Sequence, residues 1–227
     1  RCCRRPPPAW RAGTACTAAH RDPLGKENDR SVNLEEAKRL AKRTLSKKRY
    51  THTVNVKKMA VKLAKRYGED PDRAAMAALL HDMAKELPKD RMLQILQENA
   101  IMSDNAHLRP SPVWHGVCAA ILARTKWDIA DEGILQAVAC HTTGRPGMTR
   151  LDKILFLADM TSEDRSYPEA DILRRLEMED LDRAMIEALR MNIQWLEESG
   201  KPVDPVSRDA WTDLRKTYYG GNSSYEE

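Results

Sequence analysis

The 227-residue sequence contains few signals for a membrane-bound, secreted or disulfide-bonded protein. It has no uninterrupted apolar run of the ~18 residues that a membrane-spanning helix requires. No apolar segment follows the arginines near the N-terminus, so we expect no secretory signal. The five cysteines form no C-x-x-C pair, which argues against zinc-ribbon and thioredoxin-like folds. Together these absences favour a cytoplasmic protein that lacks disulfides and does not contact membranes.

A basic surplus, which is typical of nucleic-acid-binding proteins, is absent from most of the chain. Residues 1–30 carry seven basic and three acidic residues, which accounts for the whole net charge of +4. The rest of the chain is therefore neutral, and we expect no nucleic-acid partner. Residues 1–32 have no hydrophobic periodicity, so we interpret them as a disordered basic tail. A folded domain is expected over 33–218 and a flexible tail over 219–227.

The sequence also lacks alternating strand patterns, hairpin signals and internal repeats. Apolar residues instead recur at helical spacing, and capping residues such as Asn33, Asp70 and Asp131 precede several of these segments. Gly68 and Gly200 provide two helix ends. We therefore predict an all-α fold. Lys47–Arg49 are expected to follow the end of the first helix. The predicted helices span residues 34–45, 50–67, 71–80, 88–99, 113–127, 132–140, 150–159, 170–177, 181–199 and 205–218.

The central predicted helix ends in two side chains that can bind metal. The apolar run from Ala74 to Leu80 leads directly into His81 and Asp82. A buried imidazole and a buried carboxylate need partners, because an unpaired buried charge is costly. A bound cation would satisfy both groups. An isolated His-Asp pair is more often a helix cap, so the interpretation depends on further ligands elsewhere in the chain.

Further candidate ligands lie near the ends of other predicted helices. His52, His115 and His141 each lie near one end of a helix that has an apolar face. Asp159 follows Leu155 by four residues and so falls on a core face, where carboxylates are rare without a partner. A hydrogen-bonded core histidine, or a carboxylate at a helix N-terminus, is the simpler explanation for any one of them. As a set without thiolates, they favour a catalytic iron, manganese, cobalt or zinc site over a structural zinc site.

Several motifs resemble those of a known family. Arg49-Tyr50-Thr51-His52-Thr53, Leu79-Leu80-His81-Asp82 and Asp159 resemble the HD-domain superfamily of metal-dependent phosphohydrolases, whose fold is a helical bundle. Trp114-His115-Gly116, His141-Thr142-Thr143-Gly144-Arg145 and Lys153–Asp159 are similar to the bacterial YqeK family. Members of that family are symmetrical bis(5′-nucleosyl)-tetraphosphatases, which split diadenosine tetraphosphate into two ADP. The resemblance covers roughly residues 45–215.

The resemblance implies a set of functional residues. One or two ions, with iron expected and manganese, cobalt or another divalent transition metal as alternatives, would be bound by His52, His81, Asp82 and Asp159. Asp82 and Lys85 would be catalytic, although Lys85 can equally be a solvated surface residue. The substrate, a dinucleoside tetraphosphate, and its ADP product would be bound by His52, Asp82, His115, His141, Thr142, Asp159 and Arg165. Arg145 is a second arginine that suits phosphate but can also face solvent.

Two departures from the family pattern accompany these matches. The family tends to have an aromatic residue and a Glu-Pro pair after Asp159, where this chain has Met160-Thr161-Ser162-Glu163-Asp164, and Asp152 stands where glutamate is usual. The motifs also leave two other functions open. One is an HD-type nucleotidase or phosphodiesterase that acts on another nucleotide, and the other is a non-catalytic nucleotide-binding helical module. The oligomeric state stays open, with a homodimer as one arrangement.

Overall fold

The computed structural model describes residues 32–99 and 109–220, so most of the predicted disordered tail 1–32 and residues 221–227 of the predicted tail 219–227 lie outside these ranges. The last residue of the predicted tail 1–32, Val32, donates a backbone hydrogen bond to Trp127, and residues 219–220 belong to the last helix instead of the predicted C-terminal tail. The described residues form α-helices and one short 3₁₀ helix without any strand, which confirms the all-α prediction. The helices are α1 (Leu34–Thr44), α2 (Lys47–Tyr67), α3 (Pro71–Leu80), α4 (Lys89–Glu98), η2 (Ser111–Val113), α5 (Trp114–Trp127), α6 (Glu132–Cys140), α7 (Arg150–Thr161), α8 (Pro168–Glu179), α9 (Leu181–Glu198) and α10 (Pro205–Gly220).

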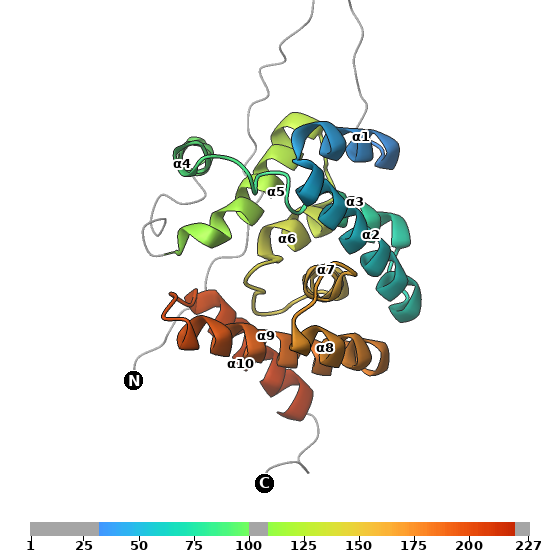
Figure 1. Ribbon diagram of the computed structural model, residues 1–227, viewed down its shortest axis with the longest axis vertical. Coiled ribbons are helices and arrows are strands. Elements are labelled where there is room, and N and C mark those ends of the chain that lie inside the picture. The colour runs from blue at the N-terminus through green and yellow to red at the C-terminus, as the bar shows by residue number, and fades with distance from the viewer. Residues whose placement is uncertain (1–31, 100–108, 221–227) are drawn as a thin grey trace, which may run out of the picture. The chain divides into compact units, whose positions relative to one another are not determined.

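The alanine-rich helix α3 lies in the centre of the domain. It packs against α1, α2, α5, α6 and α7, and every residue from Ala74 to Leu80 is buried. The small side chains let these neighbours approach closely. Helix α7 packs against α2 and α3 on one side and against α8 and α9 on the other, as Figure 1 shows. The end of α3 and the length of α7 therefore lie in the interior, where they can hold a buried site.

The helix ends follow the capping residues found in the sequence. Asn33 forms a capping box with Glu36, and the Asp70 side chain accepts hydrogen bonds at the start of α3, where Pro71 is the first helical residue. Thr149 and Asp152 form a second capping box at the start of α7. These contacts fix where α3 and α7 begin, and hence which residues they bring to the interior.

The structure corrects the predicted start of the second helix. Lys47–Arg49 come after the end of α1, as predicted, but they form the first turn of α2, which was expected to begin at Tyr50. The Ser46 hydroxyl accepts a hydrogen bond from the Arg49 backbone N–H and so caps this earlier start. The Glu86 side chain accepts hydrogen bonds from the Ser46 N–H at 2.8 Å and from its hydroxyl at 2.6 Å, and holds the cap in place. This contact spans 40 residues and is invisible to a local sequence pattern.

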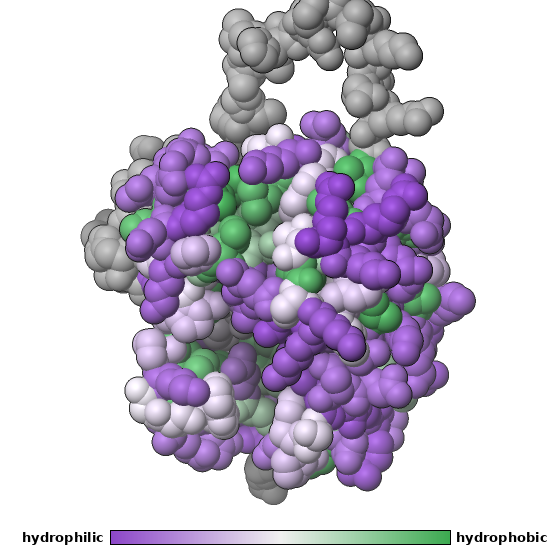
Figure 2. Space-filling model, turned by 45° about the horizontal axis from the view of Figure 1, so that its top comes forward, coloured by the Kyte–Doolittle hydropathy of each residue, from purple (hydrophilic) through white to green (hydrophobic). Residues whose placement is uncertain are grey.

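The surface is largely polar. Figure 2 shows hydrophilic side chains over most of one face, with hydrophobic residues in small areas between them. Among the described residues, the large hydrophobic side chains classed as exposed are Ile172, Trp195 and Tyr219. No helix in the described ranges is both long and apolar enough to cross a membrane. Cys118 and Cys140 are free and buried, as expected for cysteines that pack as small hydrophobic residues.

A buried carboxyl group lies between α8 and α7. Glu177 is 1% exposed, and the Thr161 hydroxyl lies 2.8 Å from its Oε2. Burial raises the pKa of Glu177 to about 7. The hydrogen bond with Thr161 and the positive charges of Lys62 and Arg174 oppose this shift only in part. A carboxyl whose pKa is higher in the folded state than in the unfolded state destabilises the fold as pH rises between the two pKa values.

Glu177→Gln is therefore expected to raise the thermal midpoint at pH 8 and to change it little near pH 4.5. The rise in the pKa of Glu177 from 4.5 to about 7 lowers the free energy of unfolding by about 3 kcal/mol above pH 7. For a domain of this size, that corresponds to roughly 5–10 °C in the thermal midpoint. Thermal unfolding at several pH values checks this expectation. Glu179→Gln, an exposed change on the same helix, is the control and should show no such pH dependence. Equal effects of Glu177→Gln at both pH values would contradict the assignment.

Candidate metal centre and active site

The structure brings the four predicted metal ligands together from three segments of the chain. His52 lies on the buried side of α2, His81 and Asp82 follow the end of α3, and Asp159 lies near the end of α7. One donor atom each from His52, His81 and Asp159 lie within 4.8 Å of one another. The Nε2 atom of His52 is 2.9 Å from an Asp159 oxygen, and the Nε2 atom of His81 is 3.4 Å from an Asp82 oxygen.

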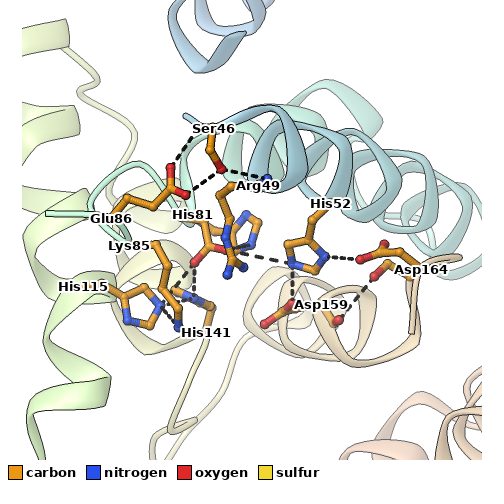
Figure 3. A network of polar contacts seen from close by, with 12 residues as sticks. Ser46, Arg49, His52, His81, Lys85, Glu86, His115, His141, Asp159 and Asp164 are labelled. Carbon is orange, nitrogen blue, oxygen red and sulfur yellow. Dashed lines mark hydrogen bonds and ion pairs between the residues drawn. The ribbon is translucent and has the colours of Figure 1, made fainter. Parts of the chain in front are cut away.

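Two further histidines complete the cluster on the other side of Asp82. The Nε2 atoms of His115 and His141 lie 3.3 Å and 3.9 Å from Asp82 Oδ1, and 3.1 Å from each other. His81, Asp82 and His141 form a second group whose donor atoms lie within 4.8 Å of one another. The sequence analysis included His141 among the candidate ligands, and the family resemblance assigned it to the substrate; its geometry suits a metal ligand. Figure 3 shows this side of the cluster.

Backbone carbonyl groups orient three of the four imidazole rings. His81, His115 and His141 each place Nδ1 against the carbonyl oxygen three residues earlier, at 2.7, 2.8 and 2.7 Å. A carbonyl oxygen only accepts hydrogen bonds, so Nδ1 carries the proton and Nε2 of the neutral ring is left with a lone pair. Histidines that bind metals are oriented in this way by a hydrogen bond from the other ring nitrogen. All three Nε2 atoms therefore lie toward the carboxylates as potential ligands.

The charges in the cluster suit a bound cation. Burial alone would raise the pKa of Asp82, but the His81 and His115 imidazoles outweigh it and hold that pKa well below its usual range. Burial likewise opposes ionisation of Asp159, yet His52, His81 and Arg165 lower its pKa. Burial lowers the pKa of His141 to about 3, and the neighbouring His115 and His81 add to this effect. At neutral pH the cluster thus contains two carboxylates and at least one neutral imidazole, the forms that bind metal.

The hydrogen bonding of two imidazole rings in the cluster indicates that a cation can bind there. The Nε2 atom of His81 is buried without a hydrogen-bond partner, and that of His52 faces Asp159 without hydrogen-bond geometry. A buried polar atom without a partner is costly, and a cation between imidazoles and carboxylates removes that cost. The donors are nitrogen and oxygen atoms, a set that suits iron, manganese, cobalt or a catalytic zinc. The residues present therefore fit a divalent transition metal.

Three basic side chains surround the carboxylates. Arg49 lies 2.7 Å from Asp82, Arg165 lies 2.6 Å from Asp159, and the Lys85 amine lies 3.3 Å from the His115 ring. Partial burial of its amine lowers the pKa of Lys85, although the nearby carboxylates oppose the shift. Lys85 and Arg165 were predicted from the sequence. Arg49 was interpreted as a cation after the first helix and as part of a motif, not as a site residue. Its position three residues before His52, about one turn along α2, was the available signal.

Two other residues of the predicted loop after α6 lie in different surroundings. Thr142 directly follows His141, and its hydroxyl oxygen is buried without a partner. Arg145 instead forms an ion pair with the fully buried Asp152 at 2.7 Å, so it stabilises the start of α7. Of the two arginines that the sequence suggested for phosphate binding, Arg165 lies beside the His-Asp cluster, whereas Arg145 is paired with Asp152.

Gly116 allows α5 and α6 to pack closely beside the cluster. A Cβ atom at this position would lie 3.1 Å from the Val138 carbonyl oxygen and 3.1 Å from His141 Nδ1. These are the two atoms of the hydrogen bond that orients the His141 ring. The absence of a side chain at position 116 thus preserves the orientation of His141.

Comparison with known proteins agrees with this geometry. A family model described as "HD domain" matches residues 49–164, and it includes every member of the His-Asp cluster. An all-helical domain that gathers histidines and aspartates around one buried centre therefore defines this protein as an HD-type protein. A crystal structure titled as a predicted HD superfamily hydrolase involved in NAD metabolism, from Clostridium acetobutylicum, superimposes with a TM-score of 0.77 at 32% identity. That match covers 81% of this chain and 97% of the other.

Sequence relatives narrow the assignment. Two proteins named "Bis(5'-nucleosyl)-tetraphosphatase, symmetrical" are similar to this chain. The Bacillus subtilis protein is 37% identical, with 77% of this chain and 93% of the relative covered. The Staphylococcus aureus protein is 36% identical, with 81% and 98% covered. This chain belongs to the HD-domain family, and these symmetrical tetraphosphatases are among its relatives.

Proposed function

We propose that this protein is a metal-dependent hydrolase that splits diadenosine tetraphosphate, and related dinucleoside tetraphosphates, symmetrically into two nucleoside diphosphates. The observation that carries the proposal is the convergence of His52, His81, Asp82 and Asp159 on one buried centre, in a chain that is 37% identical to a named symmetrical tetraphosphatase. Iron as the resident ion, which the family resemblance implies, and a cytoplasmic location, which the cysteine usage favours, are part of the same proposal.

The side chains of the site suit the hydrolysis of a phosphoanhydride. A cation held by His52, His81, Asp82 and Asp159 would supply positive charge for a phosphate oxygen and would lower the pKa of a water molecule toward neutrality. Arg49 and Arg165 pair with the two carboxylates and are close enough to bind the phosphate oxygens of a polyanionic substrate. Lys85 lies beside His115 and can stabilise charge that develops on the phosphoryl group.

His115 and His141 suit phosphate binding and proton transfer. Their Nε2 atoms lie beside Asp82 Oδ1, and their Nδ1 atoms are held by backbone carbonyls. A second ion would find a ligand set in Asp82, His115 and His141, with Asp82 shared between the two ions. Thr142, which directly follows His141 and whose hydroxyl oxygen is buried without a partner in the described part of the chain, is the proposed nucleotide contact that the family resemblance implies.

Product identity tests the proposal. Purified protein incubated with diadenosine tetraphosphate and Fe²⁺ or Mn²⁺ is expected to yield ADP as the sole nucleotide product, because symmetrical cleavage leaves two phosphates on each adenosine. Anion-exchange chromatography of the products, with a chelator-treated sample as the control, measures this. Formation of AMP and ATP would mean asymmetric cleavage and would contradict the proposal. Faster turnover of another nucleotide in a substrate panel would instead favour the nucleotidase or phosphodiesterase alternative.

A further inference from the structure

His52 differs from the other three histidines in how its ring is held. It lies in the second turn of α2, inside the helix, whereas His81 and His141 follow helix ends and His115 lies in the first turn of α5. Inside a helix the preceding carbonyl oxygens already accept backbone hydrogen bonds, and the Nδ1 atom of His52 instead faces a group from another segment of the chain. That group is the Asp164 carboxylate, whose Oδ2 lies 2.8 Å from His52 Nδ1 (Figure 3).

The Asp164 carboxylate is itself held from two sides. Its second oxygen accepts a hydrogen bond of 3.2 Å from the Asn55 side-chain amide, three residues after His52 on the same helix. Its loop is fixed by Arg174 of α8, which donates to three backbone carbonyl oxygens. These bonds measure 3.0, 2.9 and 2.6 Å and reach Thr161, Ser162 and Arg165. The carboxylate is therefore placed against the ring by a braced loop.

We propose that Asp164 is a positioning residue that holds the His52 ring with Nδ1–H on the carboxylate and Nε2 toward Asp159 and the bound cation. The inference rests on the proposed metal site. A carboxylate on the outer nitrogen fixes the tautomer of a metal-binding histidine and increases its basicity. Asp164 belongs to the segment 160–164, where this chain departs from the pattern of the family it resembles.

Metal affinity tests the proposal without any substrate. Metal-stripped Asp164→Ala is expected to bind Co²⁺ about 10–100-fold more weakly than the unmodified protein in calorimetric titrations. Asp164→Asn keeps an oxygen acceptor for Nδ1–H and is expected to fall between the two. Glu163→Ala is the matched control, because its side chain is 78% exposed and its Lys58 contact is 3.5 Å long. Affinity of Asp164→Ala equal to that of the unmodified protein would overturn the proposal.

A spectroscopic signature separates positioning from a general loss of structure. In the Co²⁺-loaded protein, the Nδ1 proton of each bound imidazole gives a paramagnetically shifted NMR signal that exchanges with solvent. The His52 signal is expected to be lost or broadened in Asp164→Ala and retained in Glu163→Ala. Its retention in a folded Asp164→Ala protein would reject the role. If Asp164→Ala does not fold, as judged by circular dichroism, Asp164→Asn decides, because unchanged Co²⁺ affinity in that variant would also reject it.

The outcome is independent of the proposed catalytic activity. A protein that binds Co²⁺ and shows the Asp164 effect, yet fails to hydrolyse diadenosine tetraphosphate, would retain this inference and lose the proposed substrate. A protein that binds no Co²⁺ at all would lose the metal site and the inference together.

Discussion

His81→Ala is expected to lower kcat/KM for diadenosine tetraphosphate by at least about 10³-fold, which corresponds to about 4 kcal/mol of transition-state stabilisation. His81 is completely buried, and its Nε2 atom has no hydrogen-bond partner among the described residues. Removing it leaves Asp82 without one of its two nearest imidazoles, at 3.4 Å, and takes one ligand from the proposed cation. The measurement is steady-state hydrolysis with saturating Mn²⁺, together with the metal content of the purified variant.

Helix α3, which His81 caps, should tolerate this substitution, because alanine favours helices and four of the ten residues of α3 are already alanine. Circular dichroism is therefore expected to change little. Met76→Ala, a buried residue on the same helix that is no ligand, serves as the control and should lose stability but keep its kcat. In the double variant with Asp159→Ala, the two losses should not add, because ligands of one ion act as a unit. Retained activity in His81→Ala would remove this histidine from the metal site.

Asp152→Ala is expected to lower the free energy of unfolding by about 2–4 kcal/mol, or the thermal midpoint by roughly 5–15 °C. The Asp152 side chain is fully buried, accepts a 2.9 Å hydrogen bond from the Thr149 N–H and lies 2.7 Å from Arg145. Its removal breaks the capping box of α7 and leaves the Arg145 guanidinium, which is 27% exposed, without its carboxylate. Breaking such a pair costs more than the pair itself contributes, because one charge stays behind.

Two variants make this second expectation specific. Asp152→Glu retains a carboxylate at the third position of the capping box and should keep most of the stability. Arg145→Ala combined with Asp152→Ala should cost less than the sum of the two single variants, because they remove one shared interaction. Chemical denaturation measures both. A change of less than about 2 °C in the midpoint of Asp152→Ala would show that the ion pair and the cap contribute little.

Most of the fold follows from local signals in the sequence. Capping residues such as Asn33 and Asp70 and the helical spacing of apolar residues predicted the helices and their approximate ends. The start of α2 was missed, because the local pattern treats Lys47–Arg49 as cations after α1. The Glu86 carboxylate, 40 residues away, holds the Ser46 cap that begins α2 earlier. Interactions between distant segments of this kind leave no periodic signal.

The candidate site was predicted in part. Buried positions on apolar helix faces, together with the family motifs, singled out His52, His81, Asp82 and Asp159, and the structure brings them together. Asp164 and Arg49 were not predicted as site residues. Asp164 lies in a loop without periodicity, and its contact with His52 spans 112 residues, so only tertiary structure reveals it. Charged residues at such positions resemble ordinary solvated ones in a single sequence.

The distribution of the proposed metal ligands over α2, the end of α3 and α7 has a consequence for the lifetime of the protein. No contiguous piece of the chain presents the complete set, so the unfolded polypeptide has little affinity for the ion. An ion that binds only the native state stabilises it by mass action, by about 4 kcal/mol when its free concentration is a thousand times the Kd. Metal starvation would therefore shift the population toward forms that proteases cleave, and the turnover of this protein would report the supply of its ion.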